Sequence, residues 1–293
     1  MGKLIQQIAS PEVLNDSWKR LRNDRAVWSE NISRREMEKD IVFHLTTLAN
    51  DLKSGSYKPS NVRFSSISKA DGKKRIISAL TLRDKVAQRS VLTVIEKFGE
   101  KIFHQDSYAY RKGRSIEMAV SKAREYILCD LFWLVDADIK KFFDEIPHTQ
   151  LKKSIAKIIP DKSVQKLIFR WIDIGTPKTG LMQKRRGIPQ GSIISPFLCN
   201  VYLSDFDTYL SKQNLPFVRF ADDFIIFTPD RKAAEKALNY IRKILKKMGL
   251  KLNERKTKIV KSGPNVKFLG RKLPKPNANN ITTRKSYKKK GRN

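Results

Sequence analysis

The segment RFADDFIIF (residues 219–227) places two adjacent carboxylates between two runs of β-forming residues. The runs are FVRF (residues 217–220) and FIIF (residues 224–227), and the tripeptide containing Asp222 and Asp223 separates them. Two β-type runs joined by so short a polar segment predict a hairpin. Acidic residues at a hairpin tip usually serve the turn, so this pair alone indicates a turn and no chemistry.

A second acidic pair follows an earlier strand-like segment. FWLV (residues 132–135) is a short apolar run, typical of a buried strand, and Asp136 and Asp138 come directly after it. Acids that follow a strand usually face water. The charge of the whole chain is the observation that indicates a chemical role for the two acidic pairs.

The chain is strongly basic. Its 293 residues contain 61 Lys and Arg against 29 Asp and Glu, a formal net charge of +32 at pH 7. Such an excess opposes compaction unless a polyanion neutralises it, and nucleic acid is the expected polyanion. An anionic membrane surface is the alternative, but no stretch approaches the ~20 apolar residues of a membrane span. The N-terminus also lacks the apolar core of a secretory signal.

Cysteine usage agrees with an intracellular setting. Cys129 and Cys199 are too few for a disulfide framework or a thiolate zinc site. The sequence therefore predicts a soluble, cytoplasmic polyanion binder with no membrane partner.

Acidic clusters need a reason in so basic a chain, because carboxylates near a phosphate ligand repel it, and the binding of divalent metal is the expected reason. Mg²⁺ prefers carboxylate oxygens and couples to substrate phosphates. Two such ions about 3.5–4 Å apart would stabilise both the attacking and the leaving oxygen of phosphoryl transfer. We therefore expect the two strand ends to converge on two Mg²⁺ ions, for which Mn²⁺ is the expected substitute.

The remaining pattern predicts an α+β fold. Residues 1–55 have helical spacing, and two β-type runs between residues 56 and 77 flank Asp71-Gly72, a hairpin signal. Ser195-Pro196 is typical of an N-cap followed by the first helical residue. The order of elements predicts a sheet covered by helices on one face. Further helical spacing is found at residues 82–98, 115–128 and 232–248 and from residue 148 onward.

Seven ordered segments of the chain resemble the motifs of reverse transcriptases of the bacterial group II intron-like lineage. The resemblance covers roughly residues 60–272 and implies a right-hand polymerase fold with fingers and palm. It also implies RNA-templated DNA synthesis from dNTPs. The segments are SKADGKKRIISALTLRDKVAQRSV (68–91), DSYAYRKGRSIEMAV (106–120), LVDADIKKFFDEI (134–146), GIPQGSIISPFLCNVYL (187–203), RFADDFIIF (219–227), LKLNERKTKI (250–259) and VKFLG (266–270).

The resemblance assigns the catalytic carboxylates. It implies that the metals are held by Asp138, Asp222 and Asp223, with the backbone of Ile139 as a further ligand. Asp136 and Asp144 lie beside the family position, which favours structural roles for them. Lys256 matches a lysine that protonates pyrophosphate as it leaves, and nearby Lys258 competes for that assignment.

The resemblance also implies contacts to the incoming dNTP. Lys69 and Arg75 flank the fingers hairpin and would clamp the triphosphate, although each could be an ordinary surface base. Phe143 matches a steric gate that excludes a ribose 2′-OH, whereas a core role suits Phe142 better. Gln190 would lie along the nucleotide.

Glycines and a C-terminal motif complete the implied site. Gly187 and Gly191 would let the backbone approach the nucleotide and the template closely. The residues that resemble the primer grip are Phe268, Leu269 and Gly270.

Two departures from the family pattern shape the expected domains. Phe220 stands where a tyrosine usually precedes the Ala-Asp-Asp, which removes a hydroxyl group, and the chain ends soon after the primer grip. We therefore expect the thumb to be missing or vestigial. The expected domains are fingers (residues 1–130), a palm (131–272) with a fingers-like insertion at about 149–186, and a basic tail (273–293).

The expected setting is a compact, defence-associated reverse transcriptase. It would copy a dedicated, structured non-coding RNA into cDNA during antiphage defence, and that RNA would wrap the basic surface. Retron and CRISPR-associated enzymes are alternatives within the family. A catalytically idle RNA-binding protein with the same fold is the alternative from another class, although an idle site gains nothing from clustered carboxylates. The oligomeric state stays open.

Overall fold

The protein is described by a computed structural model that covers residues 2–68, 74–175 and 185–276. Its contacts divide the chain into two compact units. Unit 1 comprises Met1–Ile102 and Phe143–Tyr202, and unit 2 comprises Phe103–Phe142 and Leu203–Asn293. The assignment of fingers, palm and insertion to these units stays a prediction.

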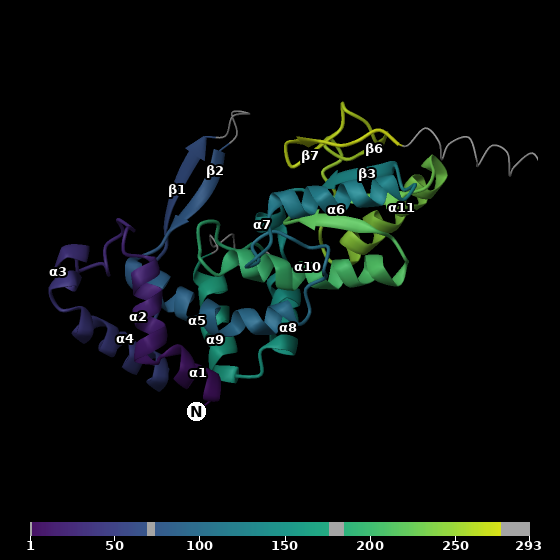
Figure 1. Cartoon of the computed structure of the whole chain (residues 1–293). Coiled ribbons are helices and arrows are strands. Elements are labelled where there is room, and N and C mark those ends of the chain that lie inside the picture. The colour runs from purple at the N-terminus through teal and green to yellow at the C-terminus, as the bar shows by residue number, and fades with distance from the viewer. Residues whose placement is uncertain (1, 69–73, 176–184, 277–293) are drawn as a thin grey trace, which may run out of the picture. The chain divides into compact units, whose positions relative to one another are not determined.

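Unit 1 is mainly helical (Figure 1). The predicted helices in residues 1–55 and 82–98 are confirmed, and local signals bound them. Ser33 and Glu36 form a capping box at the start of α3, and Gly55 ends α4 in the left-handed conformation with φ 79°. The helices wholly in this unit are α1 (Lys3–Ile8), α2 (Pro11–Arg20), α3 (Arg34–Lys39), α4 (Ile41–Ser54), α5 (Leu82–Glu100), α8 (His148–Ile158) and α9 (Lys162–Ile174).

The predicted hairpin of unit 1 is confirmed. Strands β1 (Arg63–Ser68) and β2 (Lys74–Ala79) pair antiparallel, with Arg63 opposite Ala79. Arg75 lies on β2 opposite Ile67. Lys69 lies outside the described residues, as does the Asp-Gly turn.

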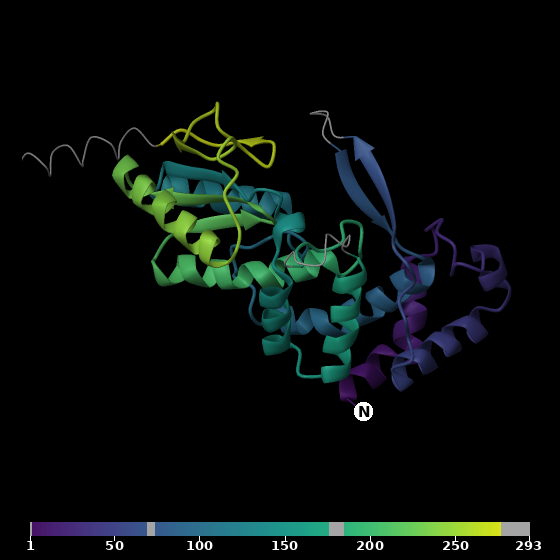
Figure 2. The same cartoon turned by 180° about the vertical axis from the view of Figure 1, so that it is seen from behind.

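Unit 2 is built on an antiparallel sheet of four strands in the order β4-β5-β3-β6. Figure 2 shows the chain from behind. The predicted strand after residue 131 and the predicted hairpin at residues 217–227 are both confirmed. The strands are β3 (Trp133–Asp138), β4 (Phe217–Phe220), β5 (Asp223–Thr228) and β6 (Lys258–Lys261). A separate small hairpin joins β7 (Lys267–Phe268) to β8 (Arg271–Lys272).

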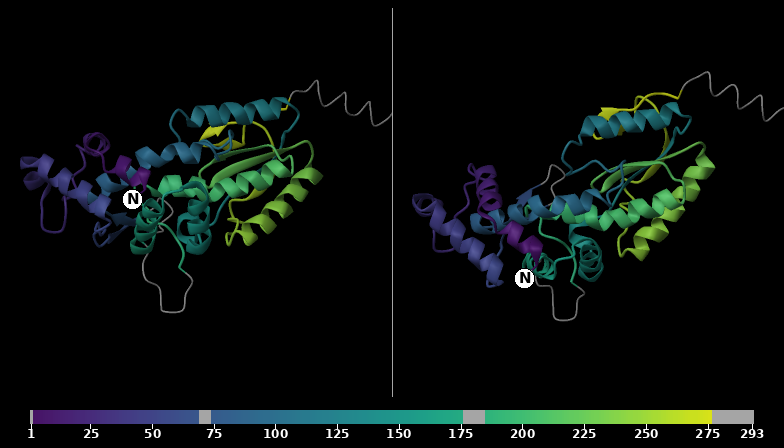
Figure 3. Two further views of the ribbon diagram at one scale, coloured as in Figure 1. Left: turned by 90° about the horizontal axis from the view of Figure 1, so that it is seen from below. Right: turned by 60° about the horizontal axis from the view of Figure 1, so that its bottom comes forward.

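The prediction that helices cover one face of this sheet is wrong. On one face, Leu134, Ile225 and Phe227 share a core with residues of α6 (Ile116–Leu128). On the other face, Phe224 contacts Phe206 of α10 (Ser195–Lys212) with ring centroids 5.1 Å apart. Figure 3 shows α11 (Arg231–Lys247) on that side as well. Strand β5 is apolar on both faces, so both must be covered.

The start of α10 also differs from expectation. Its first helical residue is Ser195, one position earlier than predicted, because the carbonyl of Ile194 accepts from the Leu198 N–H. The Ser195 hydroxyl donates to the Pro189 carbonyl at 2.7 Å.

A short helix, α7 (Phe142–Glu145), follows β3. In the described part of the chain, none of the helices combines the length and apolarity that crossing a membrane demands.

A buried ion pair supports the β4–β5 hairpin. The side chains of Arg219 and Asp207 are 0% and 1% exposed, and the guanidinium donates to both carboxylate oxygens at 2.7 and 2.6 Å. The same guanidinium donates to the Ala221 carbonyl at 3.1 Å. Since each charge is out of water, neither is stable there without the other.

We predict that Asp207→Asn lowers the free energy of unfolding by about 3–5 kcal/mol, because it leaves a buried charge uncompensated. Replacing both partners by Arg219→Met with Asp207→Leu should recover most of that loss, since no charge then needs a partner. Urea denaturation measures both effects. A single variant as stable as the unmodified protein would contradict this account.

Candidate active site

Four carboxylates gather where β3 ends and β4 turns into β5. The strand register places Asp138 directly opposite Asp223. Asp222 occupies the turn, and Asp136 lies two residues before Asp138 on the same side of β3. The structure therefore brings together the two acidic clusters that the sequence analysis singled out.

The pKa of Asp223 reflects both its burial and the negative charges beside it. Burial, followed by the charges of Asp136, Asp138 and Asp222, raises the pKa of Asp223 to about 7, while Lys256 opposes the shift. Burial also raises the pKa of Asp136, and Lys258 opposes that shift. A site of this kind favours either protons or added cations.

Two side chains hold Asp138 in place. Lys256 Nζ lies 3.2 Å from Asp138 Oδ1, and Asn253 Nδ2 donates to Asp138 Oδ2 at 2.8 Å. The Asn253 N–H also donates to the Asp138 carbonyl at 2.8 Å. The hydrogen bond to Asp138 is the main cause that raises the pKa of Lys256, which keeps this lysine protonated.

The structure distinguishes the two lysines that the sequence analysis left as candidates for the proton donor. Lys256 contacts Asp138, whereas Lys258 lies on β6 with its Nζ 3.3 Å from Asp136 Oδ2. Asn253 was missed by the sequence analysis. Its only sequence signal is its place in the same motif, three residues before Lys256.

Backbone hydrogen bonds connect the two carboxylate-bearing segments. The Ile139 N–H donates to the Asp222 carbonyl at 3.2 Å, and Ile139 also bridges to Leu252. Ala221, just before Asp222, has φ 59°, the left-handed region that a residue with a Cβ rarely adopts. The guanidinium of Arg219 holds its carbonyl, so the buried ion pair fixes the turn that presents Asp222.

The donor set fits a hard divalent cation, although the side chains are not arranged around one. Four carboxylates supply the oxygens of this site, the ligands that Mg²⁺ prefers. Within the described ranges, no group of three or more His, Cys, Asp or Glu side chains is arranged to hold a metal ion. Lys256 and Asn253 occupy both oxygens of Asp138, so coordination requires at least that carboxylate to exchange partners.

Two of the residues predicted to contact the dNTP, Phe143 and Gln190, belong to unit 1. Phe143 is half-buried, in contrast to Phe142, which is 1% exposed. The Ile188 N–H donates to the Phe143 carbonyl, and Gln190 Nε2 donates to Asp144 Oδ1 at 2.9 Å. The structure thus associates Phe143 and Gln190 with one loop, residues 187–191.

The fold of the protein itself requires both glycines of this loop. Gly187 and Gly191 have φ 89° and 101°. A Cβ on Gly191 would lie 2.8 Å from the Ser78 carbonyl oxygen, and one on Gly187 would lie 3.1 Å from the Asp144 carbonyl oxygen. Both the left-handed backbone and close packing therefore require glycine here.

The predicted primer-grip residues form the β7–β8 turn in unit 2. Leu269 and Gly270 have φ 50° and 78°, so both central residues of this two-residue turn are left-handed. Phe268 is 1% exposed and belongs to the core that includes Ile225. The motif is thus anchored to the sheet that carries Asp223.

We predict that Asp223→Asn stabilises the metal-free protein at alkaline pH. The folded-state pKa of about 7 lies above the ordinary value of 3.8, so the native state is disfavoured increasingly as pH rises between these values. The gain at pH 8 should be on the order of 3 kcal/mol and should vanish near pH 4. Denaturation in EDTA across this range measures it. An equal effect at both pH values would contradict this electrostatic origin.

Comparisons with known proteins agree with this geometry. Residues 67–273 match the family model described as reverse transcriptase (RNA-dependent DNA polymerase). Protein YkfC of Escherichia coli K12 is 27% identical over 92% of this chain and 82% of its own length. Group II intron-encoded protein LtrA of Lactococcus lactis is 27% identical over 84% of this chain, which spans only 41% of LtrA.

Solved structures show the same fold. Apo telomerase from Candida tropicalis, truncated from its C-terminal domain, aligns with a TM-score of 0.56 at 16% identity, covering 83% of this chain and 60% of that one. The mixed helices and antiparallel sheet are consistent with the predicted right-hand polymerase fold. Because the family model covers well over half of its length, the chain belongs to the reverse transcriptase family.

Proposed function

We propose that Asp138, Asp222 and Asp223 carry out nucleotidyl transfer in this reverse transcriptase, which copies an RNA template into cDNA. The observation that carries the proposal is the register that places Asp138 opposite Asp223, with Asp222 adjacent in the turn. Burial, together with the charges of Asp136, Asp138 and Asp222, raises the pKa of Asp223, and a buried surplus of negative charge of this kind favours divalent cations.

The three carboxylates would hold two Mg²⁺ ions, or Mn²⁺ in their place, with the Ile139 backbone as a further ligand. Such ions supply Lewis-acid stabilisation of the oxygens that react. Lys256 is the proposed proton donor to the departing pyrophosphate. It lies beside Asp138 and is protonated there, so a proton donor is in place next to the carboxylates.

The residues proposed to select and hold the dNTP are Lys69, Arg75, Phe143 and Gln190. Half-burial of Phe143 supports its role, because a steric gate must present a ring surface that a sugar can meet. Phe268, Leu269 and Gly270 are proposed to hold the primer. Their left-handed turn, fixed to the core by Phe268, supports a rigid contact.

A dedicated structured non-coding RNA is the proposed template, and cytoplasmic antiphage defence is the proposed setting. The net charge of +32 supports an extended RNA partner. A retron is the second candidate, favoured by similarity to the retron Ec73 reverse transcriptase of Escherichia coli, 27% identical over 60% of this chain and 58% of that protein.

We predict that Asp138→Asn and Asp222→Asn each reduce dNTP incorporation at least a thousandfold while RNA affinity stays within about twofold, because each removes a metal ligand but few phosphate contacts. Primer extension and filter binding measure the two properties. Lys232→Glu, at an exposed position of α11, is a control for a change of surface charge. Polymerisation retained in either variant would contradict the assignment of these carboxylates as catalytic, whereas an unmodified protein that binds RNA and makes no cDNA would favour the idle RNA-binding alternative.

We predict that Phe143→Ala admits ribonucleotides at least tenfold better relative to dNTPs, because it opens space at the sugar 2′ position. Phe142→Leu is the matched control, since the buried neighbour should alter stability and leave sugar selection unchanged. Single-nucleotide incorporation with paired rNTP and dNTP measures the ratio. An unchanged ratio in an active Phe143→Ala enzyme would leave this ring a packing role.

We predict that one discrete RNA species co-purifies with the protein from its native host and is copied faster than an arbitrary primed RNA. Sequencing the bound RNA and its cDNA identifies the template, and its form separates a defence RNA from a retron transcript. Equal synthesis on both templates without a discrete bound RNA would overturn the dedicated-partner proposal.

A further inference from the structure

A buried histidine that takes no part in the proposed chemistry contacts the GIPQG loop (residues 187–191) of unit 1. His148, at the start of α8, is 3% exposed. Its Nε2 lies 2.7 Å from the Gly187 carbonyl oxygen. Since a carbonyl oxygen only accepts, Nε2 must carry the hydrogen of this bond. His148 therefore donates to the first residue of the loop.

The other ring nitrogen of His148 faces a group of charged side chains. Nδ1 lies 3.4 Å from Asp173 Oδ1, and Lys152 Nζ donates to both oxygens of the same carboxylate at 2.8 Å. Arg185 Nη1 lies 3.5 Å from Asp173 Oδ1 as well. Because one nitrogen meets this group and the other meets Gly187, the ring is held from two sides. Its hydrogen bond to the loop therefore has a fixed direction.

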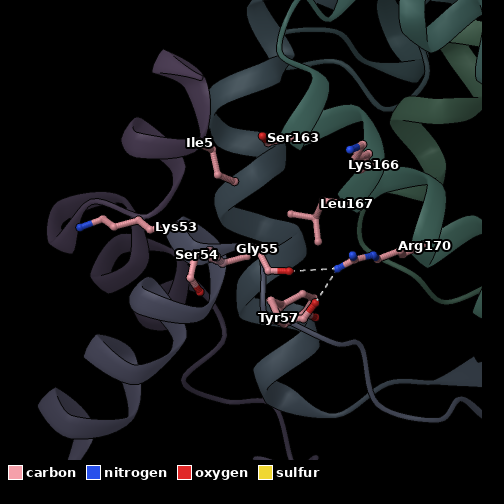
Figure 4. A pocket seen from close by; sticks show the side chains of 10 residues that line it. Ile5, Lys53, Ser54, Gly55, Tyr57, Ser163, Lys166, Leu167 and Arg170 are labelled. Carbon is pink, nitrogen blue, oxygen red and sulfur yellow. Dashed lines mark hydrogen bonds between the residues drawn. The ribbon is translucent and has the colours of Figure 1, made fainter. Parts of the chain in front are cut away.

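The helix that carries Asp173 is anchored in turn. Arg170 lies three residues earlier on α9, and its Nη1 donates to the Tyr57 carbonyl at 2.9 Å and to the Gly55 carbonyl at 3.4 Å (Figure 4). Both carbonyls belong to the segment that follows α4. The side chains that support His148 are thus connected to a second part of unit 1, away from the loop in sequence.

A second buried side chain holds the far end of the loop. Gln88 of α5 is 1% exposed. Its Oε1 accepts from the Ser192 hydroxyl at 2.7 Å and from the Ile193 N–H at 3.0 Å. Helices α8 and α5 therefore hold the two ends of residues 187–193, each through one buried polar side chain whose hydrogen bonds are costly to break.

The groups proposed to meet the dNTP are connected to the backbone between these two anchors. The Ile188 N–H donates to the Phe143 carbonyl at 2.7 Å, and the Gln190 carbonyl accepts from the Ser78 N–H at 2.7 Å. Gln190 Nε2 donates to Asp144, the residue after Phe143. A shift of residues 187–193 would therefore displace both the Phe143 ring and the Gln190 side chain, and shifts of about 1 Å are enough to impair a reaction.

We propose that His148 and Gln88 are positioning residues, which fix residues 187–193 and thereby the groups of this reverse transcriptase that bind the dNTP. The inference rests on the proposed dNTP contacts of Phe143 and Gln190. Both positioning side chains are almost wholly covered by protein, so they act through the loop and not on the substrate. Since the loop would bind the nucleotide before and during the reaction alike, loss of an anchor should raise KM more than it lowers kcat.

The test compares His148→Asn with His148→Gln in the full chain. The longer Gln amide reaches the position of Nε2 and can donate to Gly187, whereas the Asn amide reaches only the position of Nδ1. In single-nucleotide incorporation, His148→Asn should raise the KM for dNTP about fivefold or more with kcat within about twofold, and His148→Gln should restore KM. The control is His44→Asn on α4, whose ring lies 5.8 Å from that of Trp28, and it should change neither value.

Hydrogen–deuterium exchange without nucleotide, in EDTA, tests the anchor apart from catalysis. The Gly187 and Ile188 N–H groups donate to the Ile146 and Phe143 carbonyls. Their exchange should become about threefold faster or more in His148→Asn and stay unchanged in His148→Gln, because loosening the loop opens these bonds. Equal exchange or equal KM in the two variants would overturn the proposal, as would faster exchange with an unchanged KM.

Gln88 is tested in the same two assays. Gln88→Leu removes the acceptor and should raise KM and speed exchange of residues 192 and 193, whereas Gln88→Glu keeps an acceptor oxygen and should have the smaller effect. An unchanged KM in Gln88→Leu would overturn its positioning role. Failure of the catalytic proposal is a separate result, since it appears as polymerisation retained by Asp138→Asn or Asp222→Asn.

Discussion

The buried guanidinium of Arg219 is the constraint on which the organisation of unit 2 depends. It contacts Asp207 of α10 and the Ala221 carbonyl, while its backbone N–H donates to the Asp106 carbonyl and its carbonyl accepts from Tyr108. Two segments outside the hairpin, α10 and residues 106–108, therefore meet at one residue of β4. Burying such a charge is costly, and complete satisfaction of its donors is what makes the arrangement specific.

That constraint allows the carboxylates to approach one another. Asp138 and Asp223 face each other across two hydrogen-bonded strands, where their repulsion would separate any flexible segments that carried them. The hairpin cannot relax, because Arg219 holds the turn and Ile139 ties it to β3. Burial and the neighbouring carboxylates together raise the pKa of Asp223, and Lys256 and Lys258 contact Asp138 and Asp136 of the cluster. A rigid acidic site of this kind is prepared for cations before they bind.

Local sequence signals predicted the hairpins, because period-two patterns and short turns act over few residues. The meeting of the acidic clusters, which are distant in sequence, was predicted from their chemistry, since carboxylates in so basic a chain pointed to shared divalent cations. Contacts of single side chains with distant partners were out of reach. Asn253 carries no local mark of its contact with Asp138, and the Ser195 hydroxyl donates to Pro189 although its sequence suggests a cap. Similarly, the apolar runs of β3 and β5 could be recognised as buried, but the helices that cover each face could not be counted from them.

The net charge can be counted from the sequence, but only the structure shows which cations are already neutralised. From the sequence, every lysine and arginine is an equal candidate for contact with RNA. The structure removes those already neutralised, such as Arg83, which contacts Asp51, and Arg219, which is wholly buried. What remains informative is the set of cations that no anion neutralises. Lys53 and Lys166 belong to that set, because neither has a hydrogen bond or an ion pair among the described residues, so both stay available to an anionic partner where Arg83 and Arg219 do not.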